Sequence, residues 1–325
     1  MDINLTLSHY SDHFFASACA VYAVCLVLLV VELAGTRVQK LVAKDEAREL
    51  VGAGGPVATA SSPGIVVDER RDRSIGERLG RMGYAVLVAG LLLHISSIVL
   101  RGMATHRWPW GNMYEFVTIT CAGAVVVGLI ALRKPENRPV LVFVLTPVLI
   151  LLGIAGKWLY TDAGPVVPSL KSYWLAIHVT IVSIGSGIFL VSGAASLLFL
   201  WRRRYDGREL PSGILGNVLS RLPSTQQLDR IAYATVIVAF PLFSAGVICG
   251  AIWAESAWGR FWGWDPKETV SFIAWVVYAA YLHARATAGW KNSRAAWINI
   301  AGFVAMIFNL FVINYVVSGL HSYAG

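Results

Sequence analysis

The chain has 325 residues, of which 56% are hydrophobic and only 14% are charged. A soluble domain carries about 25% charged residues, so this composition excludes an ordinary soluble globule, and it excludes a disordered chain because disorder requires low hydrophobicity and high charge. The formal net charge of +8 has a meaning only once the positions of the charges are known. The composition therefore predicts an integral membrane protein.

Eight apolar runs are long enough to cross the hydrocarbon core of a bilayer. In chain order they cover residues 14–35, 82–100, 114–132, 139–156, 172–200, 231–252, 269–286 and 295–318. No basic segment precedes the first run, as it would in a cleaved secretory signal, so this run is interpreted as a retained helix. The predicted fold class is all-α, a polytopic integral membrane protein with about eight transmembrane helices.

Lys and Arg residues are distributed unevenly between the two sets of connecting segments. Of the 27 in the chain, 21 lie in segments 36–81, 133–138, 201–230 and 285–294. Because cytoplasmic loops carry the excess of Lys and Arg, we expect both termini to face the outer, extracytoplasmic side of a cell membrane. The basic balance is then a signal of topology, and no nucleic-acid partner is predicted.

The sequence suggests a division of the chain into two parts at about residue 81. Residues 1–81 are predicted to form the first transmembrane helix and a flexible cytoplasmic loop, because the stretch 52–64 is rich in Gly, Ala, Ser and Pro. Residues 82–325 are expected to form the main transmembrane domain. Within it, the basic segment 201–230 has an amphipathic stretch at 213–222, which favours contact with anionic membrane lipids.

The outer segment 253–268 reads WAESAWGRFWGWDPKE and holds a third of the twelve tryptophans of the chain. They are Trp253, Trp258, Trp262 and Trp264. An aromatic belt at the membrane interface explains one or two tryptophans at the end of a helix. Four of them among turn-forming glycines favour an apolar aromatic shelf that binds a flat ligand.

The sequence Asp265-Pro266-Lys267-Glu268 has the pattern of a helix start. Asp is a favoured N-cap residue, Pro is favoured at the first helical position, and Glu at the third position completes a capping box. Asp265 and Glu268 are therefore expected to begin the seventh helix and to orient the tryptophans before them. No side chain stands out as a nucleophile, so no catalytic residue is predicted.

Two histidines lie at the predicted outer face. His178 is one turn into the fifth run, and His321 follows the eighth run. A single interfacial histidine is usually hydrogen-bonded at the headgroup level. Two of them beside a tryptophan-rich segment suit an iron porphyrin, which needs axial ligands and aromatic packing around its ring.

His94 and His283 lie inside apolar runs, where ionisable side chains are costly and usually functional. The alternative is a histidine that is hydrogen-bonded between helices. At 1.5 Å per residue their depths differ by about 10 Å, so a single haem shared by both needs tilted helices or shifted helix boundaries. Arg101 and Arg107, in the outer segment 101–116, could pair with carboxylates of a ligand or extend to the lipid headgroups.

Several stretches together resemble the CcsA (ResC) family of cytochrome c biogenesis proteins, which belongs to the haem-handling WWD-domain superfamily. They are GNMYEF, PSLKSYWLAIHV, the run WGRFWGWDPKETVSFIAWVVYAAYLHARATAGWKNSRAAWINIAGF and the C-terminal FNLFVINYVVSGLHSYAG. The resemblance extends from about residue 82 to the C-terminus. The tryptophan-rich segment is typical of the superfamily, and the two C-terminal stretches are typical of this branch.

The resemblance implies a subunit of the system II cytochrome c synthase (haem lyase) that binds haem b, moves or presents it at the outer face, and acts by positioning it. By motif, His178 and His321 would be external axial ligands of the haem iron and His283 a ligand within the membrane. His94 would be a second ligand there, on a weaker match. The implied partners are a CcsB/ResB-like membrane protein and apocytochrome c, whose CxxCH cysteines would form thioether bonds with the haem.

Other classes of protein stay open. A CcmC-like protein would deliver haem to a haem chaperone. A cytochrome b-type electron carrier commonly has two histidines on one helix, and no apolar run here contains two. A transporter or channel would have charged residues along a pathway inside the bilayer, and these are scarce apart from Glu32.

Overall fold

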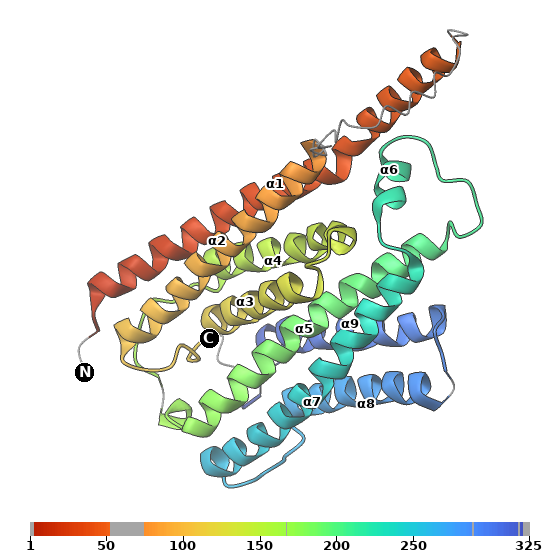
Figure 1. Cartoon of the computed structure of the whole chain (residues 1–325). Coiled ribbons are helices and arrows are strands. Elements are labelled where there is room, and N and C mark those ends of the chain that lie inside the picture. The colour runs from red at the N-terminus through yellow and green to blue at the C-terminus, as the bar shows by residue number, and fades with distance from the viewer. Residues whose placement is uncertain (1–2, 53–74, 167, 288, 318, 321–325) are drawn as a thin grey trace, which may run out of the picture.

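The protein is built from long antiparallel helices (Figure 1). A computed structural model describes residues 3–52, 75–166, 168–287, 289–317 and 319–320, and within these ranges it is all-α, as predicted. The helices are α1 (Leu5–Gly52), α2 (Ile75–Thr105), α3 (Met113–Ala131), α4 (Pro139–Trp158), α5 (Tyr173–Arg203), α6 (Ile214–Arg221), α7 (Thr225–Trp258), α8 (Pro266–Thr287) and α9 (Ser293–Tyr315), with short 3-10 helices η1 (Pro135–Asn137) and η2 (Pro168–Leu170).

Seven of the described helices are long and apolar enough to cross a membrane. They are α1, over Leu5–Leu33, and α2, α3, α4, α5, α7 and α9. The expected seventh run, 269–286, lies in α8 and is not among them. Its 22 residues are enough to span, at about 1.5 Å per residue, but the aromatic residues of α8 together with His283 and Arg285 lower its hydropathy.

Two helices extend well beyond their expected ends. The structure continues α1 to Gly52, where a flexible loop from residue 36 was expected, because residues 38–51 are mostly good helix formers such as Ala, Leu, Lys and Glu. The Gly-rich stretch after it, 53–64, lies outside the described residues. The amphipathic stretch at 213–222 is confirmed as α6.

Helix α7 also continues past the expected end at residue 252, as far as Trp258. Nothing in WAESAW interrupts a helix, and Gly259, with φ 71°, ends it in the left-handed conformation that glycine adopts easily. The loop before α8 is therefore 259–265 rather than 253–268. Trp253 and Trp258 lie on the last turns of α7.

The bundle has a layered order (Figure 1). Helices α1 and α2 pack together along one side, α3 and α4 follow, then α5 with α7, and α8 lies against α9 on the opposite side. Close contact between helices depends on small residues. A Cβ atom on Gly187 of α5 would lie 2.6 Å from the backbone nitrogen of Ala124 and 2.6 Å from the carbonyl oxygen of Thr120, both in α3.

We expect Gly187→Ala to destabilise the bundle by about 1–3 kcal/mol, because backbone atoms of α3 cannot rotate away as a side chain could. Thermal unfolding in detergent, followed by circular dichroism, measures this. Gly153→Ala is the matched control, since no atom lies within 4 Å of the added methyl group and alanine favours the helix. Equal unfolding temperatures for the two variants would contradict the close α3–α5 contact.

Candidate functional site

A large, mostly apolar cavity opens between α3, α5, α7, α8 and α9. It holds about 1450 Å³ of space that protein atoms do not fill, its open mouth included. Two loops contribute to its wall, 106–112 before α3 and 259–265 before α8, through residues that include Trp110 and Trp262. The cavity therefore opens where these two loops meet the helices and extends toward the middle of the bundle, where Leu190, Phe243 and Phe303 line it.

His178 lines this cavity, and its ring is held in a defined orientation. Its Nδ1 atom lies 2.7 Å from the carbonyl oxygen of Gly246 in α7. A carbonyl oxygen can only accept a hydrogen bond, so Nδ1 carries the proton and donates. In the neutral imidazole the lone pair is then on Nε2, which is the atom that a metal would bind. In metal proteins, a ligating histidine is typically oriented by a hydrogen bond from its other ring nitrogen, as Nδ1 makes here.

Two neighbours in α7 determine the position of the His178 ring. Trp253, only 1% exposed, lies parallel to it, with ring centroids 6.3 Å apart and an interplanar angle of 10°. One turn earlier in α7, a Cβ atom on Gly250 would lie 2.7 Å from the Cε1 and Nδ1 atoms of His178. The imidazole thus occupies a slot that only a glycine at position 250 leaves open.

The four tryptophans of the expected shelf take three different positions. Trp253 and Trp262 line the cavity. Trp258 packs edge-on against Trp253, with ring centroids 4.8 Å apart. Trp264 is 66% exposed and packs edge-on against Trp262. The backbone of Trp264 is left-handed, with φ 58°, a conformation that is uncommon for a residue other than glycine. Of the four tryptophans, only Trp253 at the end of α7 and Trp262 in the loop therefore line the cavity, so they do not form the single shelf that was expected.

The helix start predicted at Asp265 is confirmed. The Asp265 carboxylate accepts a hydrogen bond from the backbone nitrogen of Lys267, at 3.3 Å, and Glu268 accepts one from the backbone nitrogen of Asp265, at 3.1 Å. Asp265 has a second role, since its Oδ1 accepts from the backbone nitrogen of Leu320, at 2.9 Å. This bond ties the loop to the residue just before His321, which lies outside the described residues.

Lys267 is a cavity residue that the sequence interpretation missed, because the DPKE motif is explained fully as a helix cap. Lys267 lines the cavity together with Asn314 of α9, and its ammonium group donates to Oδ1 of Asn314, at 2.6 Å. Burial lowers the pKa of Lys267 from 10.5 to about 8, and the charge of Asp265 partly opposes this shift. Lys267 precedes the apolar part of α8, so it lies outside the membrane-spanning segments.

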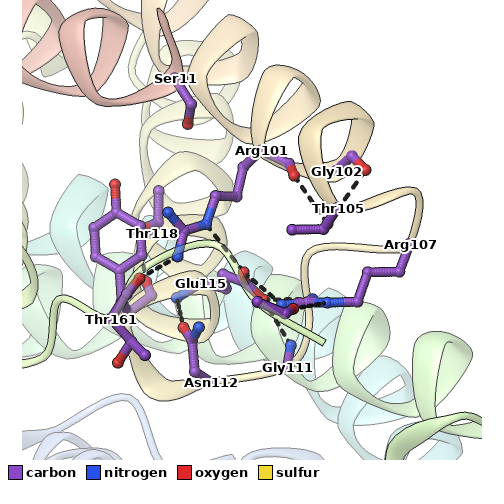
Figure 2. Close-up of polar contacts among 12 residues, drawn as sticks. Ser11, Arg101, Gly102, Thr105, Arg107, Gly111, Asn112, Glu115, Thr118 and Thr161 are labelled. Carbon is purple, nitrogen blue, oxygen red and sulfur yellow. Dashed lines mark hydrogen bonds and ion pairs between the residues drawn. The ribbon is translucent and has the colours of Figure 1, made fainter. Parts of the chain in front are cut away.

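The loop before α3 is held by a buried carboxylate (Figure 2). Glu115 accepts from both terminal nitrogens of Arg107, at 2.9 and 3.0 Å, from Nε of Arg101, at 3.2 Å, and from the backbone nitrogen of Gly111, at 2.7 Å. Arg101 is only 2% exposed and also donates to the carbonyl oxygen of Thr161. The two arginines thus hold the loop, instead of pairing with a ligand or reaching the headgroups.

The two histidines expected within the membrane do not face each other. His94 of α2 is fully buried, and its Nδ1 lies 3.2 Å from the hydroxyl of Tyr22 in α1, which is the hydrogen bond between helices that the alternative interpretation requires. His283 is exposed on α8. Helices α2 and α8 lie on opposite sides of the bundle (Figure 1), so a haem bound by both is incompatible with this arrangement.

Three buried polar atoms around the cavity have no hydrogen-bond partner in the part of the chain that the structure describes. They are Nε1 of Trp110, Oγ1 of Thr120 and Oδ1 of Asn309, and all three residues line the cavity. Buried polar atoms are almost always hydrogen-bonded, so such atoms in an apolar cavity indicate where polar groups of a ligand, or water, are bound. Together with His178 and the tryptophans, they fit a flat, amphipathic, metal-containing ligand such as haem.

The fold and the cavity define a multi-pass membrane protein with a cavity lined by aromatic residues and a histidine. Comparison with known proteins gives the family. The sequence profile described as "Cytochrome C assembly protein" matches residues 110–321. The chain therefore belongs to the cytochrome c assembly protein family, which confirms the resemblance found in the sequence.

Relatives named cytochrome c biogenesis protein CcsA match most of the chain. The protein of Parasynechococcus marenigrum (strain WH8102) is 33% identical over 267 residues, which cover 76% of this chain and 87% of the relative. That of Mesostigma viride is 32% identical over 272 residues, covering 77% and 87%. Among solved structures, the cytochrome c haem lyase CcmF has a similar fold, with a TM-score of 0.62 at 16% identity over 96% of this chain and 47% of that one.

We expect Asp265→Ala to release the segment before His321 from the loop. The variant loses the helix cap, which costs about 0.5–2 kcal/mol, and the acceptor for the Leu320 amide. Amide hydrogen exchange measured by mass spectrometry on C-terminal peptides checks this. Asp162→Ala, at an exposed position in the loop after α4, is the control. Unchanged exchange at Leu320 in Asp265→Ala would show that the bond between them does not hold the segment.

Proposed function

We propose that the protein binds haem b in this cavity and presents it at the outer face of a cell membrane for attachment to apocytochrome c. The observation that carries the proposal is the orientation of His178, whose Nδ1–H is fixed by Gly246 and whose Nε2 therefore has the ligand lone pair. Trp253 and Trp262 provide the apolar walls that a porphyrin ring requires. His178 and His321 are then the external axial ligands.

The topology that we propose places this cavity outside the cytoplasm. Both termini face outward, as the distribution of Lys and Arg predicts, and α8 crosses the bilayer although it is less apolar than the other spans. The cavity wall formed by loops 106–112 and 259–265 is then extracytoplasmic. Apocytochrome c receives its haem on that side, so the proposed site and its substrate are on the same side of the membrane.

Attachment requires positioning more than acid–base chemistry. In the proposed reaction each CxxCH thiol of apocytochrome c would add across the C=C bond of a haem vinyl group, so that an S–H bond and a C=C π bond break while a C–S bond and a C–H bond form. The part of this chain is to bind the haem in one orientation, so that the thiols meet the vinyl edge in a reactive geometry. Trp253, Gly250 and Asp265 contribute by fixing the ring of His178 and the loop around it.

A CcsB/ResB-like membrane protein is the proposed partner, and His283 is the proposed haem ligand within the membrane. Because His283 is exposed on α8 and His94 is buried on the opposite side, a second axial ligand near His283 would come from such a partner. His94 could bind haem only after α1 and α2 separate. We therefore regard His94 as the weaker of the two proposed ligands.

His178→Gly tests the proposal directly. The purified parent protein is expected to show the spectrum of low-spin, bis-histidine haem b. The variant should lose most of that signal, and added imidazole should restore it by filling the vacated space. His106→Gly is the control, since His106 is exposed and has a positive φ of 49°, which glycine tolerates. A parent protein without haem, or an unchanged spectrum in His178→Gly, would refute the assignment.

The same preparation separates the alternatives. A haem that is retained through repeated reduction and oxidation without transfer to any apocytochrome would favour the cytochrome b-type electron carrier. Transfer to a haem chaperone instead of a CxxCH peptide would favour the CcmC-like function. Thioether formation in the presence of the CcsB/ResB-like partner is the result that we expect.

The charge of Lys267 gives a pH dependence. Since the pKa is about 8, the side chain is a cation at pH 7 and mostly neutral at pH 9. We expect the affinity of the parent for ferric haem, whose propionates are anionic, to fall by about 10-fold between these pH values. Lys267→Met should bind at pH 7 as the parent does at pH 9. A parallel decrease in both proteins, measured by spectroscopic haem titration, would exclude Lys267 as the cause.

A further inference from the structure

The two loops at the cavity, 106–112 and 259–265, share the same pattern of ion pair and helix start. In each, an arginine lies eight residues before a glutamate, and the glutamate occupies the third position of the helix that follows. The pairs are Arg107 with Glu115 and Arg260 with Glu268, at 2.9 Å and 3.4 Å respectively. The same Arg–Glu spacing thus occurs in both loops that line the cavity.

The hydrogen bonds inside the two loops also correspond. Each glutamate accepts from a loop glycine, Gly111 at 2.7 Å and Gly263 at 2.8 Å. The residue before each helix is an Asx whose side chain accepts from a backbone nitrogen of the first turn, Asn112 from Glu115 at 2.9 Å, and Asp265 from Lys267 at 3.3 Å. Each loop contributes one tryptophan to the cavity wall, Trp110 and Trp262.

Trp110 differs from its counterpart in having a buried, unused hydrogen-bond donor. Its Nε1 has no partner within the described part of the chain. An indole N–H can only donate, and Trp110 lines the cavity, so an occupant of the cavity can supply the acceptor that the described residues do not. The oxygen acceptors of haem are its two propionate carboxylates, since the four porphyrin nitrogens are bound to iron. The end of the cavity at Trp110 therefore suits a propionate.

We propose that the loop 106–112 is a second haem-binding loop and that Trp110 binds a haem propionate through its indole N–H. The proposal rests on the proposed function, because it requires haem as the ligand. It deepens that function by assigning the orientation of the ring, with a carboxylate edge toward α3. Thr120, whose Oγ1 is another of the three unpartnered atoms, also lines the cavity on α3.

The test uses Trp110→Phe in the full-length protein, purified in detergent and loaded with haem. Phenylalanine keeps an aromatic ring in the wall and removes the donor. The rate at which haem passes to an excess of apomyoglobin is expected to rise about 10-fold, as for loss of a hydrogen bond to a charged group. Trp108→Phe is the matched control, because Trp108 is 71% exposed and does not line the cavity.

A second ligand separates the hydrogen bond from the packing of the ring. With haem dimethyl ester, whose carboxylates are uncharged esters, the parent and Trp110→Phe should release the ligand at rates within about 2-fold of each other, since the charged acceptor is absent. An equally large difference with the ester would mean that Trp110 acts by packing alone and would overturn the proposal. So would an unchanged rate with haem itself.

Failure of the proposed function gives a different result. If the parent protein and Trp108→Phe take up no haem, the function is wrong and the rates cannot differ. If both bind haem with a bis-histidine spectrum while Trp110→Phe behaves as the parent does, only the assignment of Trp110 is wrong. Circular dichroism of each variant shows whether the helices are intact before the rates are compared.

Discussion

The structure depends most on two buried glutamates, each placed at the start of a helix and each holding the loop before it. Glu115 is 2% exposed and Glu268 is 9% exposed. A buried carboxylate is strongly unfavourable unless it is paired and hydrogen-bonded. Here each one accepts from an arginine and from loop backbone amides, which would otherwise lack partners at the edge of the bilayer. Removing a glutamate would take away the anionic partner of Arg107 or Arg260 and an acceptor for the loop amides, whereas removing a wall residue changes only the cavity.

The orientation of His178 follows from the close approach of α5 and α7. Loops held by the glutamates bring Trp262 and Trp110 to the cavity, while the helix pair provides Gly246 as acceptor, Gly250 as space and Trp253 as a parallel ring. The histidine is therefore fixed by Gly246, Gly250 and Trp253. Their spacings of four and three residues place them on one face of α7. Rigid elements position such a ligand more accurately than loops do, and the loops close the rest of the site.

Much of this arrangement could be predicted from the sequence. The membrane class, most helices, the helix start at Asp265 and the family depend on composition, periodicity and local motifs, which neighbouring residues determine. The end of α7 was misplaced because the clustering of tryptophans was taken as a loop, although only Gly259 has the chemistry of a helix end. Arg101 and Arg107 were considered as ligand partners because their partner, Glu115, is identified only by packing.

Gly250 and Asn314 gave no signal in the sequence, since their roles depend on contacts with His178 and Lys267 across helices. The repeated Arg–Glu spacing was visible in the sequence and was missed because the aromatic residues between the pairs differ.

The two walls of the cavity differ in the ion pairs that hold them, and this difference bears on the proposed binding and release of haem. Glu115 has two arginines and bidentate contact with one of them, so the loop with Trp110 is fixed strongly to α2 and α3. Glu268 has a single, longer contact with Arg260, and the strained backbone of Trp264 is in its loop. The connection onward to the residue before His321 is the hydrogen bond between Asp265 and Leu320. The loop 106–112 is thus held by more hydrogen bonds from arginines than the loop 259–265, so we expect haem release in the proposed function to begin on the side of the loop 259–265.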